Sequence, residues 1–222
     1  MTRVTKTRAK TRRSPAAAKA PALGVREQQK LDKRERIRRA AWDLFTSRGY
    51  EQTTTKQIAA RAGIASGTLF LYARDKPDLL FLVFHDRLSE TVNAQFASLP
   101  AQATLLDQLL HLFRGLFRMY DENPALAAEF VRSLPGADGT NAHAVNGLTF
   151  AFLHRLSVLI RAAQQRGEID AAVTPMLAAQ TIFTHYFGAL MAWLSHFVDH
   201  AVDLEPLLRE ALTLHFRGLY PR

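Results

Sequence analysis

Residues 53–70 encode two short helices joined by a sharp turn, and they read Thr53-Thr54-Thr55-Lys56-Gln57-Ile58-Ala59-Ala60-Arg61-Ala62-Gly63-Ile64-Ala65-Ser66-Gly67-Thr68-Leu69-Phe70. Gly63 favours the turn because glycine adopts backbone angles that other residues avoid. A second helix held in front of the first fits the major groove of DNA, where base edges present a distinct pattern of donors and acceptors. The segment therefore indicates a DNA partner.

Neighbouring patterns complete a three-helix unit. A first helix is predicted over residues 33–47, ended by Gly49, with one apolar face made of Ile37, Ala40, Ala41, Leu44 and Phe45. The second helix is predicted to begin with a capping box in which Thr54 and Gln57 satisfy each other's backbone amides. The third is predicted from Ser66 to Tyr72, with Leu69 facing inward.

At these positions the chain resembles the tetracycline-repressor (TetR) family of bacterial regulators. The matching residues are Ala41, Leu44-Phe45, Gly49-Tyr50, Thr53-Thr54, Ile58-Ala59, Ala62-Gly63-Ile64, Gly67-Thr68-Leu69 and Lys76. Many matches at fixed spacing are more specific than a lone helix–turn–helix pattern. The resemblance implies a DNA-binding transcriptional regulator, most often a repressor that a small-molecule effector releases from its operator.

The DNA-contacting residues are predicted on the second and third helices and just after them: Thr54, Thr55, Lys56, Ser66, Gly67, Thr68, Phe70, Leu71, Tyr72 and Lys76. Gln57 and Ile58 are expected to support the fold. Three positions depart from the family pattern, which often has Ser or Thr at Ala65, Tyr at Phe70 and Phe at Ala73. These departures put the usual set of phosphate contacts in question.

The positive charge is concentrated at the N-terminal end. Residues 1–26 hold eight Lys or Arg and no acid, and residues 33–76 hold ten bases against four acids, whereas residues 77–222 hold ten bases against fourteen acids. This asymmetry is expected of a phosphate-binding end joined to a domain that does not bind DNA. Residues 1–26 are predicted to form a disordered basic arm, which either contacts DNA, serves as a solubilising tail, or precedes the true start of translation. An Arg-rich transit peptide is disfavoured by the bacterial type of module that follows.

The amino-acid composition limits the cellular compartments in which the protein is expected. The absence of cysteine excludes disulfides and thiolate metal sites and fits a reducing cytoplasm. The resemblance implies that this cytoplasm is bacterial and that the protein is nucleoid-associated when it is bound to DNA. No apolar run approaches the roughly eighteen residues of a membrane span, so the apolar run from Leu79 to Phe84 is interpreted as buried core.

The remainder reads as six further helices, which makes the chain all-α with about nine helices. The predicted helices cover about residues 77–98, 104–120, 124–134, 147–166, 175–199 and 203–218, with a loop over residues 135–146. Thr104 with Asp107, and Asp203, are predicted to cap two of them. The expected domains are residues 27–76 for DNA binding and residues 77–222 for effector binding and dimerisation.

The last two helices carry more large apolar groups than one buried stripe requires. The relevant residues are Ile182, Phe183, Tyr186, Phe187, Leu190, Met191, Trp193, Leu194 and Phe197, followed by Leu204, Leu207, Leu208, Ala211, Leu212 and Leu219. In the resembled family the last two helices form a four-helix dimer interface. A homodimer is therefore predicted through 182–197 and 204–219, although a monomer core is the alternative. Two recognition helices about one DNA turn apart read a palindrome.

Aromatic residues indicate an effector pocket. The predicted lining is Phe113, Phe117, Phe130, Phe152, His154 and Tyr186, with Phe150 and Phe187 in the same aromatic group and Arg114, Arg118 and His185 as further polar anchors. Ordinary core packing is the alternative for any single one of them. As a group they favour an apolar or aromatic effector.

Other chemistries have little support. His196 and His200 lie four residues apart, but no third ligand follows in register, so neither a metal nor a cofactor is predicted. No catalytic motif is present, so an enzyme is not expected. The remaining rival is an architectural DNA binder driven by the basic arm, with little sequence preference.

Overall fold

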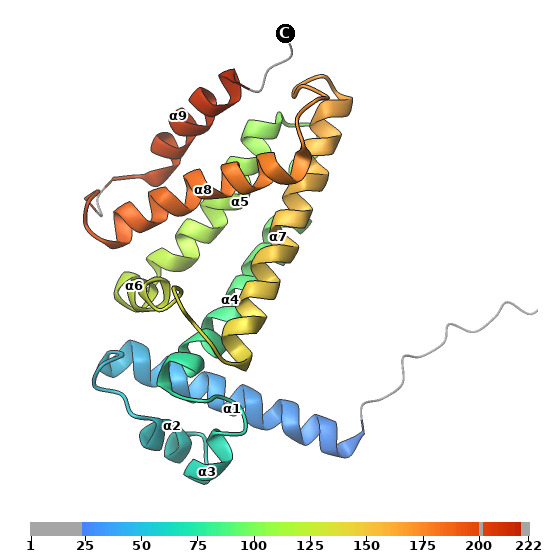
Figure 1. The fold of residues 1–222 in the computed structure, drawn as a ribbon. Coiled ribbons are helices and arrows are strands. Elements are labelled where there is room, and N and C mark those ends of the chain that lie inside the picture. The colour runs from blue at the N-terminus through green and yellow to red at the C-terminus, as the bar shows by residue number, and fades with distance from the viewer. Residues whose placement is uncertain (1–23, 200–201, 219–222) are drawn as a thin grey trace, which may run out of the picture.

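The computed structural model describes residues 24–199 and 202–218, and these fold into α-helices joined by short connections (Figure 1). The helices are α1 (Val25–Arg48), α2 (Thr55–Arg61), α3 (Ser66–Leu69), α4 (Lys76–Ala97), α5 (Leu105–Asp121), α6 (Pro124–Arg132), α7 (Thr140–Gln165), α8 (Pro175–Leu194) and α9 (Leu204–Arg217). The part of the chain that is described contains no strand, which confirms the all-α class. Its helices are too short or too polar to cross a lipid bilayer.

Helices α1, α2 and α3 form a small unit at one end of the molecule (Figure 1). The predicted apolar face of α1 is buried, and its members are Ile37, Ala40, Ala41, Leu44 and Phe45. The capping box of α2 is also confirmed, because the Gln57 amide donates to the Thr54 hydroxyl and the Thr54 amide donates to the Gln57 side chain. Both features are local, which is why the sequence pattern found them.

The start of α1 differs from its prediction. The helix begins at Val25, capped by Gly24, rather than at Lys33. Its first turns lie exposed in solvent and carry an i,i+4 hydrogen bond from Gln28 to Asp32. Good helix formers sustain such a segment without a buried face. Residues 25 and 26 therefore belong to the helix, while the remaining arm, residues 1–23, lies outside the described part of the chain.

The recognition segment is shorter than predicted. Helix α3 ends at Leu69 rather than at Tyr72, because Leu71 and Tyr72 donate to carbonyl groups only three residues back. Such bonds tighten the last turn of a helix. Phe70, Leu71 and Tyr72 thus leave α3 as a turn that leads into α4.

Helix α4 connects the small unit to the bundle. It packs against α1 on one side and against α5 and α7 on the other. The run from Leu79 to Phe84 is buried all round, as its composition predicted. A segment enclosed on both sides needs no polar stripe.

Two helix boundaries in the bundle formed by α5 to α9 differ from prediction, namely the start of α7 and the end of α8. Helix α7 begins at Thr140, so much of the predicted loop 135–146 is helical. The buried carboxylate of Asp78 accepts from the amides of Asn141 and Ala142 and so caps α7 from another helix. Helix α8 ends at Leu194 rather than near Asp199, and His196 adopts a positive φ of 60° just after it. The predicted caps Thr104 and Asp203 are confirmed at α5 and α9.

Candidate nucleic-acid interface and effector cavity

A buried hydroxyl fixes how α2 leaves α1. Thr53 is 1% exposed, and its hydroxyl lies 2.8 Å from the Gly49 carbonyl oxygen and 3.1 Å from that of Leu44. Gly63, with φ +66, turns the chain from α2 towards α3. Ile64 is partly buried against the core at this corner. Together these residues hold α3 rigidly against α2.

Helices α2 and α3, which carry several of the predicted DNA-contacting residues, lie at one end of the molecule (Figure 1). Leu71 is 82% exposed and Phe70 is 53% exposed, although both are large apolar side chains. Exposed apolar groups at this position suit contact with thymine methyl groups or sugars. The other exposed members are Thr54, Lys56, Ser66 and Gly67, and the partly buried ones are Thr55, Thr68, Tyr72 and Lys76.

Lys76 is less available than its pattern indicated. Its ammonium group donates to the carbonyl oxygens of Tyr50 and Glu51, at 3.1 and 3.4 Å. Through these two bonds Lys76 stabilises the turn between α1 and α2. The sequence pattern indicated Lys76 as a DNA contact just before the next predicted helix, so this structural role was missed.

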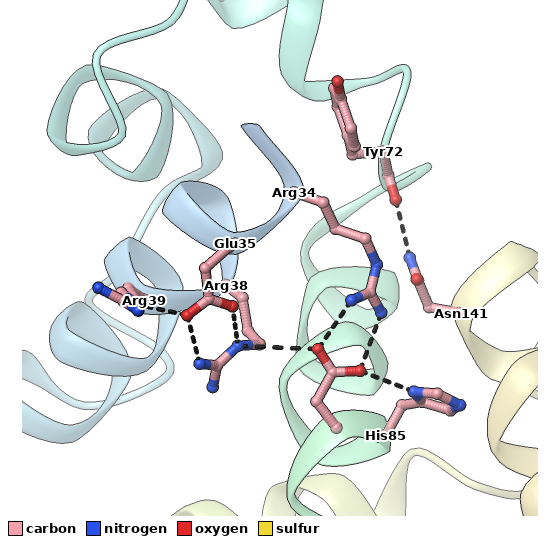
Figure 2. Close-up of polar contacts among 8 residues, drawn as sticks. Arg34, Glu35, Arg38, Arg39, Tyr72, His85 and Asn141 are labelled. Carbon is pink, nitrogen blue, oxygen red and sulfur yellow. Dashed lines mark hydrogen bonds and ion pairs between the residues drawn. The ribbon is translucent and has the colours of Figure 1, made fainter. Parts of the chain in front are cut away.

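A charge network joins α1 to α4 (Figure 2). Arg34 donates two hydrogen bonds to the Asp86 carboxylate, at 2.7 and 3.0 Å, and His85 Nδ1 lies 2.8 Å from the same carboxylate. Burial by itself raises the pKa of Asp86, but the hydrogen bonds from His85 and Arg34 hold it well below its usual range. Glu35 pairs with Arg38 and Arg39 on α1, and these bonds lower its pKa to about 2.

An apolar cavity lies inside the bundle, between α4, α5, α6, α7 and α8. Its volume is about 70 Å³, and it is lined by Leu88, Val92, Leu116, Tyr120, Phe130, Leu134, Val145, Leu148, Thr149, Phe152, Phe183, Tyr186 and Phe187. Of the predicted pocket residues, Phe130, Phe152 and Tyr186 line this cavity. The aliphatic lining was missed because Leu and Val at helical spacing look like any core.

The other predicted pocket residues lie elsewhere. Phe113 stacks behind Tyr186, with ring centroids 4.5 Å apart. Phe117 lines an outer cleft instead. His154 is exposed on α7 and is not among the residues that line the cavity, so the expectation that it lines the pocket is not met. Phe150 is likewise exposed. Helical periodicity alone did not separate the inner face of α7 from its outer face.

Two buried tyrosines are the main polar groups of the cavity. Burial raises the pKa of both Tyr120 and Tyr186 above the ordinary tyrosine value, and the two side chains also interact with each other. They therefore remain neutral in any physiological condition. Neutral hydroxyls in an apolar cavity can donate to a carbonyl or hydroxyl oxygen of a bound molecule.

An open cleft of about 520 Å³ lies outside the cavity, between α5, the end of α8 and the start of α9. Arg114 in its wall is paired with Glu205, whereas Arg118 is exposed. Phe117 lines the cleft, and its ring centroid lies 5.1 Å from that of Tyr186, which lines the cavity. These two rings separate the cleft from the cavity.

The outward faces of α8 and α9 carry exposed apolar side chains. These are Leu177 and Met191 on α8 and Leu207 and Leu214 on α9. Most of the large residues predicted for a dimer interface are instead buried within the chain: Ile182, Tyr186, Leu190, Trp193, Leu194, Leu204, Leu208 and Leu212. Leu219 lies outside the described residues. Met191, Leu207 and the 88% exposed Phe197 belong to the predicted set, whereas Leu177 and Leu214 do not.

The predicted histidine pair is only partly described, because His200 lies outside the described residues. Elsewhere in the part of the chain that the structure describes, no three His, Cys, Asp or Glu side chains gather closely enough to hold a metal ion.

Comparisons with known proteins agree with this geometry. Residues 37–83 match the family model described as "Bacterial regulatory proteins, tetR family". Over 192 residues the chain is 26% identical to the fatty acid metabolism regulator protein of Bacillus subtilis strain 168, covering 86% of this chain and 98% of that protein.

Two solved structures share the fold over nearly their whole length. FadR of Thermus thermophilus, described as a TetR-family repressor in complex with lauroyl-CoA, has a TM-score of 0.70 at 24% identity and covers 85% of this chain and 96% of its own. FadR of Bacillus subtilis, in complex with stearoyl-CoA, has a TM-score of 0.66 at 25% identity and covers 84% of this chain and 99% of its own.

Proposed function

The chain belongs to the TetR family of bacterial transcriptional regulators, and we propose from this premise that it is a homodimeric repressor released from its operator by an acyl-CoA. The observation that best supports DNA binding is the exposure of α3 and of the turn that follows it. The exposed residues there are Ser66, Gly67, Phe70 and Leu71. The proposal assigns no catalytic step and no cofactor, and it places the protein in the bacterial cytoplasm.

Each candidate DNA contact has a proposed role. The exposed N-terminus of α3, with Ser66, Gly67 and Thr68, approaches the DNA closely because these residues are small. Leu71 and Phe70 contact base edges or sugars. Thr54, Thr55, Lys56, Tyr72 and Lys76 contact the phosphate backbone and set the register. Residues 27–76 form the DNA-binding domain in this proposal, and residues 77–222 form the effector-binding and dimerisation domain.

The effector class rests on the relatives and on the cavity. A relative that is matched over 98% of its length is named for fatty acid metabolism. Two solved structures of the same fold hold lauroyl-CoA or stearoyl-CoA. The cavity of this chain is lined almost wholly by aliphatic and aromatic side chains, which suits an acyl chain. The hydroxyl pair of Tyr120 and Tyr186 offers a donor to the thioester carbonyl.

The cavity must open before it can hold such a chain. Its volume of about 70 Å³ is far below the roughly 300–1,000 Å³ of ligand pockets in general. Entry from the outer cleft requires Phe117 and Tyr186 to separate. An effector that binds only the open form shifts the population towards it, and release follows if the open form binds operator less well.

Dimerisation is proposed through the outward faces of α8 and α9. The interface residues are Leu177, Met191, Leu207 and Leu214, together with Gly188. Gly188 lies in the middle of α8, and a Cβ added there would meet nothing within the chain. Glycine weakens a helix interior, so a close approach by the partner helix at this position explains its presence.

Selection of bound fragments from genomic DNA tests the DNA-binding proposal. Purified protein is expected to recover a palindrome and to bind it about a thousandfold or more tighter than a scrambled duplex. Deletion of residues 1–23 is expected to weaken binding and to reduce its salt dependence while leaving the preference for the palindrome. Equal affinity for both duplexes, abolished by the deletion, would establish the architectural alternative instead.

Titration of operator-bound protein with acyl-CoAs tests the effector proposal. Lauroyl-CoA and stearoyl-CoA are expected to release the operator, whereas CoA alone is expected to have no effect because it lacks the acyl chain. Leu148→Arg, which introduces a charge into the cavity lining, is expected to abolish release without changing operator affinity. The exposed neighbour Asn146→Arg is the control. Equal release by CoA and by its acylated forms would remove the cavity from the mechanism.

A further inference from the structure

A buried carboxylate joins the start of α4 to the start of α7. Asp78 is 1% exposed, and its oxygens accept from the backbone amide of Arg74 at 3.0 Å and from those of Asn141 and Ala142 at 3.1 and 3.3 Å. A buried carboxylate requires such donors, because an unpaired charge away from water is costly. The bonds therefore fix the first turn of α7 against α4.

The Asn141 side chain extends this joint to the recognition segment. Its Nδ2 donates to Asp78 Oδ2 at 3.1 Å. It also donates to the Tyr72 carbonyl oxygen at 2.9 Å, and Figure 2 shows this bond. Both hydrogens of the amide are thus used, and Asn141 is only 6% exposed. Tyr72 lies in the turn that follows α3, so one side chain bonds α4 and the end of the recognition segment at once.

The backbone is shaped for this contact. Gly139 precedes α7 with φ +134, and a Cβ added there would lie 2.6 Å from Asp78 Oδ1. Only glycine permits both the angle and the approach. Nearby, Arg74 forms an ion pair with Asp138 at 2.9 Å, which adds a second bond between the same two loops. We call the set Tyr72, Asp78, Gly139 and Asn141 the α3–α7 joint.

The joint lies one helical turn from the effector cavity. Val145 lines the cavity and is four residues after Asn141, and Leu148, Thr149 and Phe152 continue the lining along α7. The opposite wall includes Leu88 and Val92 of α4. A displacement of α7 relative to α4 that opens the cavity must act on the joint, because the joint is where those two helices are bonded to each other and to Tyr72.

We infer that Asn141 is a positioning residue for DNA recognition, which carries movement of α7 to the recognition segment through the Tyr72 carbonyl. The inference rests on the proposed function, because it names the link between cavity and operator. When α7 shifts, the Asn141 amide either pulls Tyr72 with it or releases it. In both cases the segment after α3 loses the position that operator binding requires.

Asn141→Ala tests the joint directly. The variant removes the side-chain bonds to Tyr72 and to Asp78 Oδ2 but keeps the three backbone amides that donate to Asp78. The measured quantity is the ratio of operator Kd with and without saturating lauroyl-CoA, and couplings of this kind are typically about 5- to 150-fold. We expect the ratio to fall to about twofold or less. The exposed Asn146→Ala, on the same helix, is expected to keep the wild-type ratio. A merely structural Asn141 would lower the melting temperature and leave the ratio unchanged, which would overturn the inference.

A measurement on the wild type makes the test independent of how the variant folds. Coupling is reciprocal, so operator binding must protect the joint if the joint transmits to the operator. We expect saturating operator DNA to slow hydrogen exchange of the Asn141 and Ala142 amides about fivefold or more, and to leave Ile160, at the far end of α7, unaffected. Unchanged exchange at Asn141 and Ala142 would overturn the inference. This comparison needs no effector, so it separates failure of the joint from failure of the acyl-CoA proposal.

Discussion

The Lys76 ammonium lies 4.3 Å from the centroid of the Tyr50 ring and donates to the Tyr50 carbonyl oxygen at 3.1 Å. One cation thus binds both the face of an aromatic ring and the backbone of the same residue. Tyr50 in turn packs against Phe45, with ring centroids 5.2 Å apart. Lys76 therefore fixes the turn after α1 from the first residue of α4, and the phosphate contact proposed for Lys76 would be added to this role.

Replacing Lys76 is expected to affect both stability and DNA binding. Lys76→Met keeps much of the apolar stem but loses the ammonium, so unfolding free energy should fall by about 1–2 kcal/mol. Urea denaturation measures this loss, and salt-dependent operator titration measures the phosphate contact. Lys56→Met is the control, because Lys56 is exposed on α2. It should lower the salt slope by about one without a change in stability. Equal stability of both variants would contradict the structural role of Lys76.

The Asp86 network predicts a pH-dependent stability. Because the pKa of Asp86 is lower in the folded chain than in the unfolded one, its stabilisation is present above about pH 4 and is lost as pH falls towards the folded pKa. Asp86→Asn should cost about 1–3 kcal/mol at pH 7. Urea denaturation between pH 7 and pH 3 should show the two stabilities converging below about pH 4. A constant difference would mean that the charge of Asp86 contributes nothing, and Asp43→Asn, at an exposed pair with Arg61, supplies the comparison.

Phe70 predicts a gain of affinity. Phe70→Tyr adds a hydroxyl to a ring that is 53% exposed beside α3. If the ring faces the DNA backbone, the hydroxyl donates to a phosphate oxygen and tightens binding to specific and random duplexes alike, by roughly 2- to 10-fold. Fluorescence anisotropy with both duplexes measures the change. Phe150→Tyr, on the outer side of α7, should leave both affinities as they are. No gain from Phe70→Tyr would place the ring away from the backbone.

A charge substitution tests the proposed dimer interface. Leu214 is 68% exposed on α9, and Leu214→Arg should place two like charges at the two-fold interface and shift the chain towards monomer. Sedimentation velocity across a concentration series measures the shift, and operator affinity should fall with it. Phe150 is 66% exposed but lies on α7, so Phe150→Arg should leave the dimer intact. Dissociation by Phe150→Arg alone would place the interface on α7.

The local elements of this chain were predictable because their causes lie within a few residues of one another. The capping box of Thr54 and Gln57, the apolar stripe of α1 and the cap of Thr104 depend on spacings of three or four residues. The DNA-binding unit followed from them, together with the glycine turn at Gly63. The first turns of α1 were missed because they have no apolar stripe.

The candidate site was less predictable. Three of the six predicted pocket residues line the cavity: Phe130, Phe152 and Tyr186. Phe113 stacks on Tyr186, Phe117 lies in the cleft and His154 is exposed. Every one of these residues sits at a helical spacing that suits burial. Which face of α7 turns inward depends on how α4 and α8 pack against it, and this packing has no local signature.

The sequence by itself determined the helical class, the recognition unit and the concentration of basic charge beside it, because helix periodicity, capping and charge are short-range properties. Only the tertiary structure decided that Asp78 caps α7, that Asn141 bonds to Tyr72 and that Lys76 binds Tyr50. Those partners lie far apart along the chain. They meet because burying the apolar faces of α1, α4 and α7 brings them together, and in that dry environment each polar group must then find a partner.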